Sequence, residues 1–339
     1  MNLPTTFPVA RYRLECRVTR PLRLPDYGGS MLRGAFGHAL RQLACIARRP
    51  ECPGCPLLDT CPYPAIFAPP APVAAHKLQR FDSIPVPHVI EPPPWGSRLL
   101  AVGDTLNFHH VLIGRALREL PLIVLAWRRA LARGIGAGDG TAELTRLLHC
   151  GSDGEQEIHR PENSAIAVHR PAIPLTGGAD PAPTALTLRF TTPLRLQANG
   201  HALPPEKLQA RALLLALARR ASLLAEFHGD GPLLDDFSPL RRAAADVVDE
   251  KDLAWRDWRR YSSRQQREMR LGGALGNWRL HGPLAPFLPF LRLGQWLHVG
   301  KETAFGLGGY TLTETLRADI AAPAVENRER SPQTTEKKR

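Results

Sequence analysis

Lysine is scarce in this chain of 339 residues, because only 6 of its 44 basic residues are lysines and the others are arginines. Acidic residues are also few, at 32, so the formal net charge is +12. The guanidinium group of arginine makes planar, bidentate contacts with phosphate. This charge therefore indicates an anionic partner, and nucleic acid is the first candidate.

Long apolar runs are absent as well. The longest is Leu120–Trp127, far short of the ~20 residues that span a membrane. The N-terminal residues lack the basic-then-apolar layout of a signal peptide, so we expect a cytosolic protein without membrane contact. Hydrophobic residues make up 43% and charged residues 22%, which favours a folded chain of one large domain or two smaller ones.

Cysteines are too few, at six, for a disulfide scaffold of this size. Four of them cluster in the pattern C-x6-C-P-G-C-x5-C, at Cys45, Cys52, Cys55 and Cys61. In a reducing compartment such a cluster predicts a structural zinc site, with an iron–sulfur cluster or four ordinary thiols as alternatives. Four protein ligands leave no open position on the metal, so the site would stabilise the fold rather than catalyse.

Several catalytic motifs are missing too. The chain has no H-E-x-x-H, no G-x-S-x-G and no convincing carboxylate pair for two-metal hydrolysis. The segment Leu297–Tyr310 (LHVGKETAFGLGGY) resembles a phosphate loop, but Gln295 and Glu302 break that motif. Its glycines could bring backbone N–H groups close to an anion, or simply form a tight turn. The residues concerned are Gly300, Lys301, Gly306, Gly308 and Gly309.

The pattern of apolar residues predicts mixed helices and strands. Strands are expected at 10–20, 184–192, 275–281 and 309–314, and helices from Ser30 to about Ile46, over 107–133 with a bend near Pro121, and over about 206–227. Residues 47–98 are rich in proline and look irregular, and 141–183 look like short strands and turns. The polar residues from 318 onward predict a disordered tail.

One internal repeat stands out. Leu14–Leu24 (LECRVTRPLRL) and Leu186–Leu196 (LTLRFTTPLRL) end in the same Pro-Leu-Arg-Leu, and each precedes an amphipathic helix. Chance is the alternative, since leucine and arginine are abundant. We favour a duplicated strand–loop–helix unit. It predicts an α+β fold of two halves, each an antiparallel sheet with helices on one face.

The segment Trp255–Arg270 (WRDWRRYSSRQQREMR) is strongly basic. Placed on a helix, its arginines fall within an arc of roughly 140° and its aromatic residues on the opposite side. The arginines are Arg256, Arg259, Arg260, Arg264, Arg267 and Arg270. A plain solvated face is the alternative, but such faces normally mix charges, so we predict a phosphate-binding helix.

The first predicted helix has a polar face formed by Arg33, Gly34, Gly37, His38 and Arg41. His38 has open space beside Gly34, and a histidine there suits a general base. The alternative is a surface histidine that only packs on its helix. Tyr27, in the preceding loop, could reach the same space.

Taken together, these segments resemble a known family. The stretch Tyr27–Cys61, followed by Pro62-Tyr63 and Ile66-Phe67, resembles the N-terminal signature of CRISPR-associated precursor-RNA processing endoribonucleases of the RAMP superfamily. Leu112–Gly136 resembles the family's middle helix, and Arg259–Leu280 and Leu284–Tyr310 resemble its C-terminal half. The resemblance implies tandem ferredoxin-like (RRM-like) domains. We expect them at 1–175, with a Cys-rich insertion at about 45–98, and at 176–317, with a tail at 318–339.

The resemblance also implies an activity. Members bind CRISPR repeat RNA and cut it once per repeat by metal-independent attack of a ribose 2′-OH, which leaves a 2′,3′-cyclic phosphate or 3′-phosphate and a 5′-OH. Many use a histidine with tyrosine and lysine near the first helix, a pattern that His38 and Tyr27 match. No lysine is available there, so Arg33, Arg41 or Lys301 would stabilise the phosphorane. Arg256, Arg260, Arg264, Arg267 and Arg270 would bind RNA phosphates.

Two other functions remain open. One is a non-cleaving RNA-binding RAMP subunit of a CRISPR effector complex, with the same fold and no catalysis. The other is a zinc-dependent DNA-binding protein that reads duplex DNA through the cysteine knuckle, although no recognition-helix pattern follows the cysteines.

Overall fold

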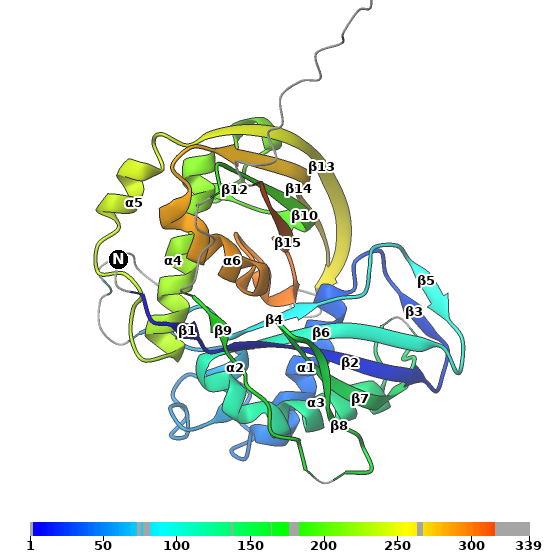
Figure 1. Ribbon diagram of the computed structural model, residues 1–339. Helices are drawn as coiled ribbons and strands as arrows, with labels where there is room; N and C mark the ends of the chain where they lie inside the picture. The colour runs from blue at the N-terminus through cyan, green and yellow to red at the C-terminus, as the bar shows by residue number, and fades with distance from the viewer. Residues whose placement is uncertain are drawn as a thin grey trace, which may run out of the picture.

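The computed structural model describes residues 3–72, 76, 82–136, 138–163, 165–175, 183–262 and 267–315. The predicted tail at 318–339 lies outside them, and so do residues 176–182 at the start of the predicted second domain. Two antiparallel sheets dominate, one of five strands in the order β4-β6-β2-β7-β8 and one of four in the order β13-β14-β10-β15. Figure 1 shows them as the lower and upper halves of the molecule.

The N-terminal half is built on the five-stranded sheet. Its strands are β2 (Val9–Val18), β4 (His88–Glu91), β6 (Thr105–Ile113), β7 (Ala142–Gly151) and β8 (Gly154–His159). Helices α1 (Gly29–Ala44) and α3 (Leu120–Arg133) cover one face. There Phe36 stacks on Trp127 with ring centroids 5.0 Å apart, and the Trp127 indole donates to His110 Nδ1 at 2.9 Å.

The helix predicted over 107–133 is wrong in its first half. Residues 105–113 form β6, Gly114–Glu119 form the 3-10 helix η1, and α3 begins only at Leu120. The apolar run of β6 is short, and such runs fit a buried strand as well as a helix. Pro121 lies in the first turn of α3, where a missing N–H costs nothing, so it starts the helix instead of bending it.

The C-terminal half repeats this arrangement. Its strands are β10 (Ala185–Leu194), β13 (Val248–Ser262), β14 (Arg267–His281) and β15 (Tyr310–Thr315), and its helices are α4 (Ala210–His228), α5 (Ser238–Ala243) and α6 (Leu288–Leu297). The repeated sequences begin in β2 and β10, both interior strands of their sheets, but the shared Pro-Leu-Arg-Leu lies in and before β3 in the first copy and across the end of β10 in the second. The tandem ferredoxin-like α+β fold is confirmed.

The basic segment 255–270 is not a helix. It belongs to a long hairpin in which β13 pairs with β14 continuously from Val248↔His281 to Ser262↔Arg267. Because strand residues alternate between faces, the expected single arginine arc does not form. The positions of Arg256 and Arg260 share one face, while Arg259 lies on the other, opposite Arg270. Arg264 lies outside the described residues.

Short elements complete the fold. They are β1 (Thr6–Phe7) with β9 (Ile173–Pro174), β3 (Leu22–Leu24) with β5 (Arg98–Leu100), β11 (Gln197–Ala198) with β12 (His201–Ala202), α2 (Pro62–Phe67), η2 (Pro205–Lys207), η3 (Ala285–Phe287) and η4 (Thr303–Phe305). Within the described ranges, no helix is both long and apolar enough to cross a membrane.

The two halves share a continuous core. Val9, Val89 and Val111, on the second face of the five-stranded sheet, belong to the same buried cluster as the leucines of α4 and α6. Helix α6 therefore lies between the two sheets (Figure 1). The glycine-rich segment follows α6 directly, and this places it at the junction of the halves.

Candidate functional site

The glycine-rich loop, residues 299–309, is folded tightly on itself. Gly306 and Gly308 have φ of +92° and +72°, which only glycine adopts freely. A Cβ on Gly308 would lie 1.8 Å from the carbonyl oxygen of Val299. The N–H groups of Lys301, Gly306 and Gly308 donate to the carbonyl oxygens of Arg195, Thr303 and Pro193, respectively. An anion bound here would therefore meet side chains rather than these amides.

The loop is seated on the start of α1. A Cβ on Gly29 would lie 2.0 Å from the carbonyl oxygen of Phe305, and one on Gly306 would lie 2.6 Å from that of Ile90. The Tyr27 hydroxyl donates to the Phe305 carbonyl at 2.8 Å. These close approaches fix the C-terminal loop against the N-terminal half.

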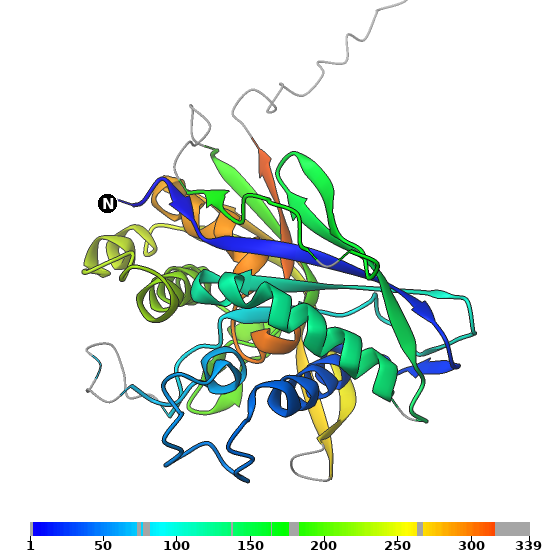
Figure 2. The same cartoon turned by 90° about the horizontal axis from the view of Figure 1, so that it is seen from below.

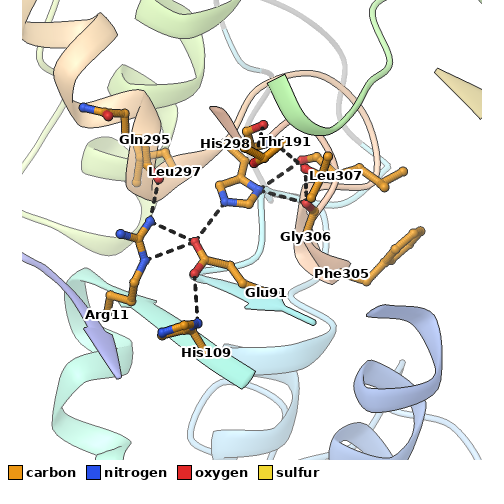
Figure 3. A network of polar contacts seen from close by, with 12 residues as sticks. Arg11, Glu91, His109, Thr191, Gln295, Leu297, His298, Phe305, Gly306 and Leu307 are labelled. Carbon is orange, nitrogen blue, oxygen red and sulfur yellow. Dashed lines mark hydrogen bonds and ion pairs between the residues drawn. The ribbon is translucent and has the colours of Figure 1, made fainter. Parts of the chain in front are cut away.

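A partly buried polar network connects the base of the loop to the N-terminal half. Figure 3 shows Glu91 between Arg11 and His298. Glu91 Oε1 lies 3.0 Å from His298 Nε2 and 2.9 Å from an Arg11 nitrogen. His298 Nδ1 lies 3.1 Å from the Gly306 carbonyl oxygen and 3.2 Å from that of Leu307. The network thus joins β2 and β4 of the first half to the loop of the second.

The charges in this network follow from its geometry. Burial alone would raise the pKa of Glu91, but Arg11 and His298 lower it to about 2, so the carboxylate is ionised at neutral pH. The two ring nitrogens of His298 face this carboxylate and the carbonyl oxygens of Gly306 and Leu307.

Tyr27 is buried under the loop. Burial raises the pKa of its phenol well above the usual range. Its ring centroid lies 4.7 Å from that of Trp95 and 5.9 Å from that of Trp258. Its hydroxyl is already used on Phe305, so Tyr27 holds the loop in place.

The other predicted catalytic residues lie further along α1. His38 is exposed, and its Nε2 lies 2.9 Å from Nε2 of Gln42. It follows Gly29 by nine residues, which is about 13 Å along a helix. The Arg33 guanidinium lies 4.2 Å from the centre of the Phe67 ring. Of the predicted set on α1 and its preceding loop, Tyr27 contacts the glycine-rich loop, through its hydrogen bond to the Phe305 carbonyl.

Arg41 contacts the cysteine segment. Its guanidinium donates to the carbonyl oxygens of Arg49, at 2.7 Å, and Pro50. The Cys55 N–H donates to the Cys52 carbonyl at 3.0 Å across Gly54, which has φ +71°. This is the expected knuckle turn.

The four cysteine thiols are unpaired and half-buried, and they are near enough for Cys45, Cys61 and Cys55 to contribute to a raised pKa of Cys52, after burial. Four thiols beside one knuckle fit zinc chemically. No three of their sulfur atoms lie within 4.8 Å of one another; among the described residues, only His109, Cys150 and Glu155 place three ligand atoms that close. Arg13 holds that glutamate through bonds of 2.9 and 2.5 Å.

The sequence patterns do not point to Arg11, Glu91 or Trp95. Glu91 and Trp95 flank a run of three prolines, and nothing in that run signals burial or partners. His298 stands within the glycine-rich segment, but its role depends on the position of Glu91, 207 residues away in sequence. Only the close packing of the two halves reveals the network.

Comparison with known proteins identifies both halves. Residues 7–171 match the N-terminal domain family AF_1859_N, and residues 188–310 match the CRISPR-associated endoribonuclease Cas6 family. An uncharacterized protein of Archaeoglobus fulgidus is 27% identical over 133 residues, which is 39% of this chain and 44% of that protein. The chain thus aligns with less than half of this relative.

Solved structures share the fold. A Cas6 of Thermus thermophilus superposes with a TM-score of 0.51 at 16% identity, covering 91% of this chain and 100% of that one. A Cas6 product complex gives 0.52 at 15%, covering 89% and 99%. A partial Cas6-RT-Cas1–Cas2 complex gives 0.56 at 15%, covering 94% of this chain and 48% of that one. Residues 188–310 therefore match the CRISPR-associated endoribonuclease Cas6 family, and the chain as a whole shares the fold of solved Cas6 structures.

Proposed function

We propose that this protein cuts CRISPR repeat RNA and so releases mature guide RNAs. The observation that carries the proposal is the Cas6 domain over 188–310, whose glycine-rich loop is seated on the start of α1. The net charge of +12 suits a polyanionic substrate. Sequence specificity, with one cut in each repeat, belongs to the same proposal.

The proposed chemistry uses the exposed face of α1. The RNA strand runs from the glycine-rich loop along this face to His38. His38 takes the proton of a ribose 2′-hydroxyl, the oxygen attacks the adjacent phosphorus, and the bond to the 5′-oxygen breaks as that oxygen takes a proton from water. The products are a 2′,3′-cyclic phosphate and a 5′-hydroxyl. The reaction needs no metal ion, since a base and a cation beside the phosphate suffice.

The cation is best supplied by Arg33 or Lys301. Arg33 precedes the candidate base by five residues on α1, which is about 1.4 helical turns, and Lys301 is an exposed residue of the loop. Arg41 is the weaker candidate, because its guanidinium already binds two carbonyl groups of the cysteine segment. Tyr27 acts by positioning the loop.

RNA phosphates would be bound by the β13–β14 hairpin. It carries Arg256, Arg260, Arg267 and Arg270, at positions spread over both faces of the two strands. Figure 2 shows the yellow strand of this hairpin passing beside α1. The hairpin would therefore guide the RNA toward the face that bears the candidate base.

We also propose that Cys45, Cys52, Cys55 and Cys61 hold a structural zinc ion, with an iron–sulfur cluster as the alternative. When bound, the ion would close the proline-rich insertion and take no part in cleavage. Arg41 would link this insertion to α1.

The experiment is a cleavage assay on a transcript of two repeats from the CRISPR array of the source organism. His38→Ala should lower the cleavage rate by at least about 100-fold, the usual contribution of a general base. The matched control is His201→Ala, because His201 is an exposed histidine on the distant β12. Equal rates for both variants would refute the role of His38.

The second candidate is an RNA-binding RAMP subunit without catalysis, acting in a CRISPR effector complex. One observation favours it: the Tyr27 hydroxyl and the N–H groups of Lys301, Gly306 and Gly308 already donate to carbonyl oxygens of the protein, so they are not available to a reacting phosphate. Tight binding of the repeat by wild-type protein without cleavage would establish this function instead.

A further inference from the structure

Trp95 lies in a small aromatic cluster that is separate from the two main cores. The cluster contains Tyr27, Trp258, Leu271, Phe305 and Leu307, with Trp95 partly buried against it. The Trp95 ring packs on Tyr27 at 4.7 Å and meets the Trp258 ring edge-on at 5.6 Å. The cluster thus joins the hairpin, the start of α1 and the glycine-rich loop.

One planar cation covers Trp95. The guanidinium carbon of Arg256 lies 4.5 Å from the centre of the indole ring. Arg256 is exposed, and no residue of the described ranges forms an ion pair or hydrogen bond with it. Stacking on Trp95 is therefore its only interaction there, and such an exposed contact is a weak one.

The indole also has an unused donor. Its Nε1 is buried and has no hydrogen-bond partner among the described residues. Buried donors of this kind are rare, and each one needs an explanation. Together with the weakly held guanidinium, it indicates that the Trp95 environment is completed by a ligand.

We propose that Trp95 is the stacking platform for one unpaired nucleobase of the bound RNA. The base takes the place of the Arg256 guanidinium, since both are planar and both stack on an indole. Arg256 then turns to the neighbouring phosphate, and an oxygen of the nucleotide becomes available to Nε1. This proposal rests on the proposed function only in taking RNA as the ligand.

The position of the platform gives it a role in specificity. Trp95 packs on the Tyr27 ring, and the Tyr27 hydroxyl donates to the Phe305 carbonyl of the glycine-rich loop. A base held there must be unpaired, so the site selects a single-stranded nucleotide next to the loop. Stacking tolerates any base, and the selection therefore concerns RNA structure rather than sequence.

The test uses a repeat RNA made uncleavable by 2′-deoxy sugars and a series of single abasic positions. Binding is measured by fluorescence anisotropy. Trp95→Leu should weaken binding about tenfold, the size expected for one stacked base, and Trp95→Phe should restore most of it. In wild-type protein, one abasic position should weaken binding by a similar factor. In Trp95→Leu, the same abasic position should no longer weaken binding.

The control is Trp255→Leu. Trp255 and Trp258 both lie on β13, but on opposite faces. The Trp255 indole is exposed, and its Nε1 donates to Asp257. It should leave the abasic penalty unchanged, and circular dichroism should show all variants folded. A penalty that persists in Trp95→Leu, or unchanged affinity in that variant, would overturn the proposal. Failure of the wild type to cleave natural repeat RNA would refute only the proposed function, because this measurement concerns binding.

Discussion

Glu91→Gln is the change that tests how the two halves are held together. The variant keeps the shape of the side chain but removes the charge that faces Arg11 and His298. A carboxyl whose pKa falls from 4.5 to about 2 on folding contributes about 3 kcal/mol to the free energy of unfolding at neutral pH. We expect the variant to lose about this amount at pH 7.

The stability difference between wild type and Glu91→Gln should depend on pH. Because the folded pKa of Glu91 is lowered, its contribution is complete above about pH 5 and is lost as the pH falls toward 2. The difference between wild type and variant should therefore shrink to about 1 kcal/mol at pH 3. Urea unfolding at both pH values measures it.

An exposed carboxylate provides the comparison. Glu143→Gln, whose partner is Arg17 on the surface, should change stability by less than about 0.5 kcal/mol at either pH. A loss in Glu91→Gln that stays the same at pH 7 and pH 3 would refute the reasoning, because the charge of Glu91 would then not be its source.

Three other predictions concern separate parts of the molecule. Gly29→Ala should lower the free energy of unfolding by about 1–3 kcal/mol in a thermal melt, because the new Cβ would lie 2.0 Å from the Phe305 carbonyl oxygen. Gly34→Ala, in open space, should leave stability unchanged or raise it by up to about 1 kcal/mol. Equal effects of the two substitutions would contradict the packing of the loop on the helix. Arg256→Ala should reduce the salt dependence of RNA affinity by about one phosphate contact, and an unchanged slope in a salt titration would exclude that contact. Cys52→Ser should remove about one bound zinc per chain in metal analysis, while Cys150→Ser keeps it; zinc retained by the first variant would disprove the site.

Much of the fold is predictable from the sequence. Alternation over 10–20 and 184–192 indicates β2 and β10, and the repeat that begins in each strand indicates their equivalence. These patterns work because strands in the middle of a sheet and helices that cover it must bury a regular set of side chains. The antiparallel sheets and the covering helices α1 and α4 follow from the same periodicity.

The basic hairpin shows where periodicity fails. Trp255, Trp258 and Tyr261 recur every three residues, as on a helix, but the pairing of β13 with β14 overrides this spacing. The deciding signal is in the partner strand, where Gly272 lets the Trp255 ring pack directly on the backbone; a Cβ there would lie 2.4 Å from it. A glycine of this kind marks close approach in a sheet.

The site is less predictable than the fold. His38 and Tyr27 are identified by residue type and position, but burial separates their roles, with one exposed and the other closed under the loop. Glu91 and His298 meet only because the halves pack together, and local patterns do not encode a contact across 207 residues.

The most direct test of the proposed cleavage is a single-turnover assay in EDTA. Purified protein is mixed with its repeat RNA and, separately, with the same RNA carrying a 2′-deoxy sugar at the cut site. We expect cleavage of the first RNA, with a 2′,3′-cyclic phosphate and a 5′-hydroxyl, and none of the second. Cleavage of the 2′-deoxy RNA, or binding of the first RNA without any cleavage, would contradict 2′-hydroxyl attack by this protein.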